Sequence, residues 1–176
     1  MQHPTYHDLG DHSESIAIDF DPTKISYEKL LDVFWGSHCP TADPICVQYR
    51  NAIFFASPEQ EKAAKKSRDE LSKKIGKPVT TAIEKLVHFW RAEDYHQKYV
   101  LQGHPAIAKE LKAIYPDMRA FTDSTAAARL NCWLAGSGDR TLFEAELEKV
   151  GVSKEAQAAL RARMGRAESR KCGASE

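Results

Sequence analysis

The sequence predicts an α+β fold for its first part and an all-helical arrangement for the rest. Three observations lead to this prediction. Residues 14–20 alternate strictly between apolar and polar side chains, a pattern typical of a half-buried strand. Residues 47–55 and 78–92 contain two further strand-like runs, helical segments separate the three, and a short helix is expected over residues 93–102. From Gly103 onward every segment has a helical pattern, so we expect a domain boundary near residue 103.

Composition and charge exclude several functional classes. The chain has 176 residues, of which 42% are hydrophobic, and this is enough apolar content for a core. Lys+Arg and Asp+Glu both number 25, so charge favours neither nucleic acid nor an anionic membrane as a partner. No apolar run approaches the roughly 18 residues of a membrane span, and the first residues do not resemble a signal peptide. We therefore expect a cytoplasmic protein.

The four cysteines do not form a recognisable metal or disulfide pattern. Cys39, Cys46, Cys132 and Cys172 contain no CxxC pair and show no regular spacing. This argues against a zinc site and against a disulfide framework. We expect free thiols, no metal and no bound cofactor.

Two helices have clear start and stop signals. Ser26 is a natural N-cap for an amphipathic helix over residues 27–38. Ser57 caps a second helix, with Pro58 at its first position and Gly76 at its end. The charged residues of this second helix need no function, since they are typical of a solvated helix face.

The stretch VFWGSHCP, residues 33–40, places a thiol close to an imidazole, an arrangement that enzymes use to make a nucleophile. However, Phe34, Trp35 and His38 lie on the same helical stripe as the neighbouring leucines, which favours a packing role. Cys39 follows the end of this helix. The negative partial charge of a helix C-terminus raises the pKa of a nearby thiol, so we expect Cys39 to be a poor nucleophile.

Two polar residues share the apolar faces of the expected strands. Glu14 is in phase with Ile16 and Ile18, so its carboxyl could be desolvated, protonated near neutral pH and able to donate a proton. The alternative is that Glu14 emerges into solvent at the end of the strand. Tyr49 likewise shares a face with Ile53, and its hydroxyl needs a partner if it is buried.

These residues lie in segments that resemble a known family. The segments PTYHDLGDHSESIAIDFDPTKISYEKLLDVFW, QYRNAIFF and AEDYHQKYVLQ, in this order, are similar to the A-type peptide-methionine (S)-S-oxide reductases, in the longer animal-type branch. The resemblance covers residues 3–102 and extends more weakly through residues 124–136. It implies a two-layer α+β sandwich with a ferredoxin-like core in residues 1–102. A helical extension over residues 103–166 and a loose tail over residues 167–176 would follow.

The resemblance also implies a mechanism and its residues. In the family, a cysteine thiolate attacks the sulfur of (S)-methionine sulfoxide in proteins or peptides and becomes a sulfenic acid. By motif, Glu14 is the proton donor, and Tyr6 and Tyr49 bind the sulfoxide oxygen. A second thiol then forms a disulfide, which thioredoxin reduces. The implied activity is repair of oxidative damage to proteins.

The nucleophile of the family has no counterpart in this sequence. It belongs to a Gly-Cys-Phe-Trp-Gly motif on the N-terminal side of the segment that begins at Pro4, together with the first strand and helix of the fold. Three hypotheses remain: an incomplete gene model, a non-catalytic homologue that binds sulfoxide or a partner, or substitution of the nucleophile by Cys39 or Cys46. We expect the chain as given to be inactive.

Overall fold

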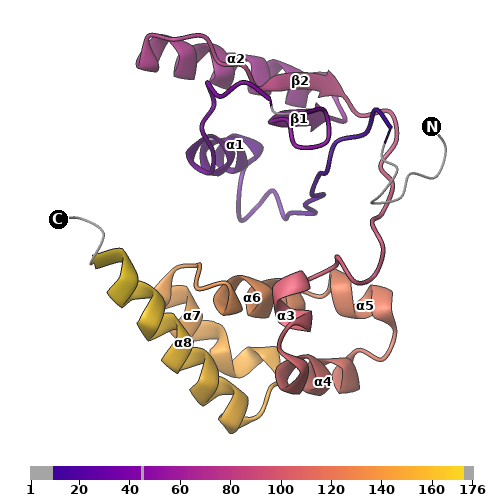
Figure 1. Ribbon diagram of the computed structural model, residues 1–176, viewed down its shortest axis with the longest axis vertical. Coiled ribbons are helices and arrows are strands. Elements are labelled where there is room, and N and C mark those ends of the chain that lie inside the picture. Colours follow the sequence, from indigo (N-terminus) through magenta and orange to yellow (C-terminus); the bar gives the residue numbers. More distant parts are fainter. Residues whose placement is uncertain (1–9, 45, 173–176) are drawn as a thin grey trace. The chain divides into compact units, whose positions relative to one another are not determined.

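The computed structural model describes residues 10–44 and 46–172, with side chains described through residue 164. Within it the chain divides into two compact units, residues 1–91 and 92–176 (Figure 1). The first unit combines helices with a small sheet, whereas the second is helical. This confirms a mixed α and β fold. In the described part of the chain, no helix is both long enough and apolar enough to cross a membrane.

The first unit is built around a β-α-β arrangement. Strand β1 (Ala52–Phe55) pairs in parallel with β2 (Ala82–Lys85), in a register that places Ala52 opposite Ala82. Helix α2 (Pro58–Ile75) connects the strands and packs against both, and α1 (Tyr27–Gly36) packs against α2 (Figure 1). The core of this unit is small. Its buried apolar residues are Leu31, Ile53 and Ala64.

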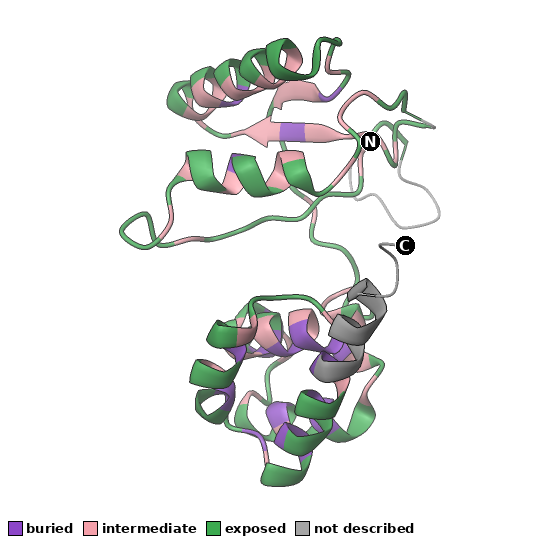
Figure 2. Cartoon of the chain, turned by 90° about the vertical axis from the view of Figure 1, so that its left-hand side faces the viewer, coloured by how far each residue is buried: buried purple, intermediate pink, exposed green. Residues whose placement is uncertain are grey.

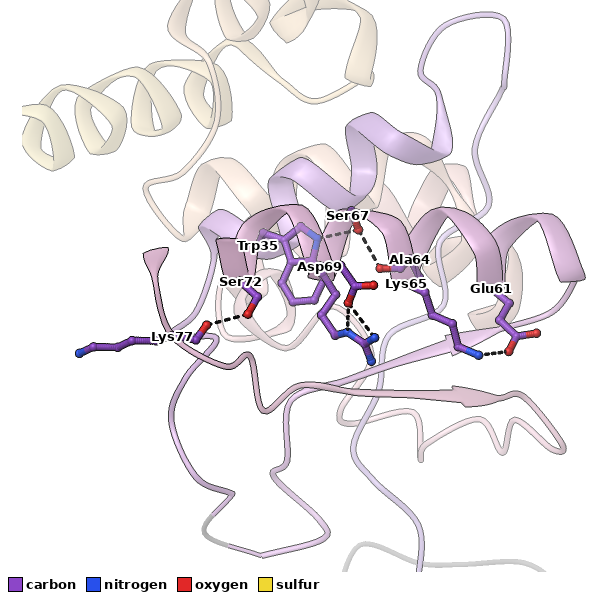
Figure 3. Close-up of polar contacts among 9 residues, drawn as sticks. Trp35, Glu61, Ala64, Lys65, Ser67, Asp69, Ser72 and Lys77 are labelled. Atoms are coloured by element: carbon purple, nitrogen blue, oxygen red, sulfur yellow. Dashed lines mark hydrogen bonds and ion pairs between the residues drawn. The ribbon is translucent and has the colours of Figure 1, made fainter. Parts of the chain in front are cut away.

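The two predicted helices of this unit form with the predicted caps. The side-chain oxygen of Ser26 accepts a hydrogen bond from the backbone N–H of Lys29, and Ser57 does the same for Gln60. Helix α2 ends at Gly76, which has a φ of 67°. Polar contacts follow the length of α2 (Figure 3). One of them joins the two helices, since Trp35 Nε1 donates to Ser67 Oγ over 3.0 Å.

The strand predicted at residues 14–20 is not present. Ile16 and Ile18, which were expected to face a core, are 83% and 55% exposed. Among the described residues, the only backbone hydrogen bond from this segment to a distant part of the chain is from Glu14 N to Gln48 O. A strand is defined by a paired neighbour, and the described sheet has only β1 and β2. Among the described residues, the alternating segment therefore has no neighbouring strand with which to pair.

The other expected strands and the helix before Gly103 are shorter than predicted. The run over residues 47–55 contributes only β1 to the sheet, and the run over residues 78–92 contributes only β2. The helix expected within residues 93–102 is reduced to α3 (Tyr99–Gln102). Periodicity locates these elements, but hydrogen-bonded neighbours set their ends.

Every regular element in the described residues of the second unit is a helix, as predicted. After α3 come α4 (Pro105–Ile114), α5 (Met118–Asp123), α6 (Thr125–Leu134), α7 (Arg140–Glu146), the 3₁₀ helix η1 (Leu147–Val150) and α8 (Lys154–Cys172). They enclose a much larger core than that of the first unit (Figure 2). Phe121, Phe143 and Leu130 are completely buried, and the rings of Trp133 and Phe143 meet edge to face at 5.0 Å.

The division into compact units differs from the expected boundary near residue 103. Leu101 of α3 is fully buried in the core of the second unit, and its backbone N–H donates to Asn131 Oδ1 of α6 over 3.1 Å. The short helix before Gly103 thus belongs to the second unit. The tail expected from residue 167 also differs, because α8 continues to Cys172. Its residues are mostly strong helix formers, which extend a helix that begins on the core.

Candidate functional site

Two of the predicted site residues, Glu14 and Tyr49, are brought together by Gln48, which was not predicted. The side-chain nitrogen of Gln48 donates to Glu14 Oε1 over 2.8 Å and to the hydroxyl oxygen of Tyr49 over 3.0 Å. The backbone carbonyl of Gln48 also accepts a hydrogen bond from Glu14 N over 2.9 Å. Residues separated by about 34 positions therefore form one polar cluster, which we call the Glu14–Gln48–Tyr49 cluster.

A second network ties this cluster to the sheet. Arg50 makes a bidentate ion pair with Glu84 of β2, with both distances at 2.7 Å. The Nε of Arg50 donates to Ser13 Oγ over 2.8 Å, and that hydroxyl donates to the carbonyl oxygen of Val47 over 2.8 Å. Arg50 thus holds the residue before Glu14 against the loop that carries Gln48 and Tyr49.

The side chains of the cluster are more exposed to solvent than the strand pattern predicted. Glu14 is exposed, and Tyr49 is 54% exposed. Of the two readings of Glu14, the structure favours emergence into solvent, because the strand that would have buried it does not form. Tyr6, the other tyrosine implied by the resemblance, lies outside the described residues.

Gln48 was missed as a candidate when the sequence was considered alone. It is half-buried and contacts both Glu14 and Tyr49. The available signal was its position directly before Tyr49 in the QYR segment. Glutamine is neither a nucleophile nor an acid, however, so its role becomes visible only through its contacts.

The aromatic residues at the end of α1 have a packing role, as predicted. Phe34 and Trp35 lie against the small core of the first unit. The ring of His38 contacts the carbonyl oxygen of Phe34 through Nδ1 at 2.8 Å and the hydroxyl of Thr81 through Nε2 at 3.2 Å. Both ring nitrogens of His38 are therefore engaged in structural contacts, and neither contact involves Cys39.

The prediction for the pKa of Cys39 was wrong in direction. Cys39 is exposed, and its Sγ lies 3.6 Å from the hydroxyl of Thr41. This hydrogen bond is the main cause that lowers the pKa of Cys39 below its ordinary value, because it stabilises the thiolate. Helix α1 ends at Gly36, so its negative end lies further from the thiol than the sequence suggested.

The other described thiols have different surroundings. Cys46 is exposed and free. Cys132, on α6 of the second unit, is half-buried, and this burial raises the pKa of its thiol. Within the described residues, no group of three or more His, Cys, Asp or Glu side chains is placed to hold a metal ion.

The chain matches a known protein family over most of its length. The family model described as peptide methionine sulfoxide reductase matches residues 1–129, which include Glu14, Gln48 and Tyr49. The chain belongs to this family, of the A type. A peptide methionine sulfoxide reductase of Drosophila melanogaster is 40% identical over 152 residues, which cover 85% of this chain and 61% of the relative.

Other members show the same relationship over a shorter region. The reductase MsrA of Methanoculleus marisnigri is 42% identical over 110 residues, 56% of this chain and 67% of that protein. Peptide methionine sulfoxide reductase A2 of Arabidopsis thaliana is 38% identical over 109 residues, 57% of this chain and 50% of that protein. The chain thus spans less than two thirds of the Drosophila and Arabidopsis members of the family.

Proposed function

We propose that this protein acts in the repair of oxidised methionine, and that its Glu14–Gln48–Tyr49 cluster binds the sulfoxide group of (S)-methionine sulfoxide in proteins. The observation that supports this most strongly is the meeting of a carboxyl and a phenol at one half-buried amide. Both Glu14 and Tyr49 match residues that bind or protonate the sulfoxide oxygen in the family. Tyr6 is the third member of the proposed binding set.

The chemistry of the substrate suits these groups. A sulfoxide oxygen carries partial negative charge and accepts hydrogen bonds but donates none. Two hydroxyl donors and a carboxylic acid can bind this oxygen and transfer a proton to it as the S–O bond breaks. A thiol must attack the sulfur, and a thiol reductant such as thioredoxin must then regenerate it. We place this reaction in the cytoplasm, and we infer that it takes place on a two-layer sandwich.

A binding experiment tests the proposal. N-acetyl-methionine sulfoxide, prepared separately as its (S) and (R) sulfoxide forms, is titrated into the isotope-labelled 176-residue protein and followed by NMR. We expect the (S) form to shift the signals of Glu14, Gln48 and Tyr49 before any others. Shifts of equal size for both forms, or shifts confined to the second unit, would contradict the proposal.

A second candidate role is favoured by the lowered pKa of Cys39. Here the Cys39 thiolate attacks the sulfoxide sulfur and receives the oxygen as a sulfenic acid, while methionine sulfoxide is reduced to methionine by two electrons. The thiol of Cys46 then displaces water from that sulfenic acid and forms a disulfide, which a thiol reductant opens. Exposure of both thiols supports this sequence of steps. Trapping of a sulfenic acid on Cys39 by dimedone, only after addition of the (S) sulfoxide, tests it.

A third candidate is binding without chemistry. The cluster could hold an oxidised methionine of a partner protein with no thiol taking part. The same titration separates this role from the second, since binding would then occur without any dimedone adduct and without loss of sulfoxide.

A further inference from the structure

We propose that Gln48 is a positioning residue of the sulfoxide site, which fixes both the separation of Glu14 and Tyr49 and the atoms through which each meets the substrate. This inference rests on the proposed function. It concerns a residue whose side chain takes no proton and performs no chemistry of its own. Three features of its surroundings support it.

The first feature is that one nitrogen serves both groups. A side-chain amide carries two N–H donors on the same nitrogen, and those of Gln48 are directed at Glu14 Oε1 and at the Tyr49 hydroxyl oxygen. Because the two N–H bonds of an amide diverge by about 120°, the carboxyl and phenol oxygens are held roughly 5 Å apart. Gln48 thereby sets the distance between the carboxyl and the phenol that would meet one sulfoxide oxygen.

The second feature is the direction of the two hydrogen bonds. Since Gln48 donates to Oε1 of Glu14, the other carboxyl oxygen, Oε2, is the one that remains for the substrate. Since Gln48 also donates to Tyr49, the phenolic hydrogen must be directed toward an acceptor other than this nitrogen. Gln48 therefore determines which atom of each group faces it, and so the orientation of both groups toward the expected sulfoxide oxygen.

The third feature is that Gln48 is itself held in place. Its backbone carbonyl accepts from Glu14 N, and the adjacent Val47 carbonyl accepts from Ser13 Oγ. On the other side, Arg50 is fixed by its ion pair with Glu84. The side chain of Gln48 is half-buried and extends from a loop that is tied at Val47 and at Arg50. A positioning group needs this support, because a mobile amide would not define the geometry of its partners.

The test compares two Gln→Leu substitutions in the first unit. Gln48→Leu keeps the approximate side-chain volume but removes both donors. Gln60→Leu is the matched control, since Gln60 Oε1 accepts a hydrogen bond from Ala56 N over 2.7 Å at the start of α2 and contacts neither Glu14 nor Tyr49. Both variants lose structural hydrogen bonds, so a purely structural role predicts similar effects. Each full-length variant is titrated with the (S) and (R) forms of N-acetyl-methionine sulfoxide.

We expect Gln48→Leu to weaken binding of the (S) form about tenfold, the effect of losing two hydrogen bonds of ordinary net strength, and to reduce the preference for (S) over (R). Gln60→Leu should bind both forms within about twofold of the unsubstituted protein. Unchanged affinity and selectivity in Gln48→Leu, or equal losses in both variants, would overturn the inference and leave the proposed function standing.

A measurement without ligand keeps the two proposals separable. In the unsubstituted protein we expect nuclear Overhauser contacts from the Gln48 side-chain amide protons to the ring protons of Tyr49. If the sulfoxide does not bind at all, the proposed function fails, whereas these contacts still report whether Gln48 joins Glu14 and Tyr49. Their absence would overturn the positioning role regardless of the titration.

Discussion

At the scale of single residues, the immediate surroundings of each thiol shift its pKa. Cys39 has a lowered pKa because Thr41 hydrogen-bonds to its sulfur, whereas burial raises the pKa of Cys132. A lowered pKa increases the thiolate fraction at any pH below the ordinary value. The thiolate is the reactive form toward alkylating agents. The two thiols should therefore differ most in reactivity on the acid side of their ordinary pKa.

This difference gives a testable prediction for Thr41. The Thr41→Val substitution keeps the shape of the side chain but removes its hydroxyl, so the pKa of Cys39 should rise toward its ordinary value. Iodoacetamide labelling of Cys39, followed by peptide mass spectrometry across a pH series, should then shift to higher pH. Cys132 serves as the internal control, with unchanged labelling. An unshifted profile for Cys39 would show that Thr41 does not set its reactivity.

At the scale of helices and strands, the glycines at helix ends show how backbone conformation limits which residues can replace them. Gly76 ends α2 with a φ of 67°, and a Cβ added there would meet no atom within 4 Å. Gly36 ends α1 in equally open space but without a positive φ. The two positions therefore differ in conformation and not in available room.

We expect Gly76→Ala to lower the free energy of unfolding of the first unit by about 1 kcal/mol, the cost of a left-handed residue that carries a Cβ. Gly36→Ala should be neutral or stabilising, since alanine is the better helix former. Urea unfolding of both variants, followed by circular dichroism, measures the difference. Equal effects of the two substitutions would argue against a conformational requirement at Gly76.

At the scale of the whole molecule, the main feature is that the two units have cores of very different size. Among the described residues, three buried apolar side chains form the core of the first unit, whereas sixteen form that of the second. Burial of apolar surface is the main source of folding free energy, so local stability should follow this difference.

Hydrogen exchange should therefore be uneven along the chain. We expect backbone amides of α6 and of α8 up to Met164 to be the most protected, and those of residues 15–20 to exchange within the shortest labelling time. Exchange measured by mass spectrometry at neutral pH checks this. Strong protection of residues 15–20 would mean that they pair with another strand in solution.

Activity is also a property of the whole molecule. Because the sulfur of Cys39 hydrogen-bonds to Thr41 and not to Glu14 or Gln48, we expect residues 1–176 to show no appreciable dithiothreitol-driven reduction of (S)-methionine sulfoxide. The assay follows formation of methionine by chromatography. Clear turnover that disappears in Cys39→Ser would favour the substitute thiol. Turnover that persists in a variant lacking both Cys39 and Cys46 would contradict our assignment of the site.

The sequence alone determined the helices and the identity of two members of the cluster. Ser26 and Ser57 correctly predicted where their helices begin. A capping side chain and the backbone N–H that it binds lie within four residues of each other, so a local pattern reveals them. The all-helical character after Gly103 was also predicted correctly, since helical hydrogen bonds join residues that are close in sequence. Glu14 and Tyr49 emerged from face periodicity and from the family resemblance, although neither signal could place them side by side.

Only the tertiary structure decided the features that depend on distant partners. Residues 14–20 have a strand pattern but no paired neighbour, so Ile16 and Ile18 are exposed. Leu101 belongs to the core of the second unit because its backbone N–H donates to Asn131 of α6. Gln48 joins Glu14 to Tyr49 only because Arg50 and Ser13 bring two distant segments together. Sheets and polar clusters need contacts between residues far apart in sequence, and no local pattern specifies those contacts.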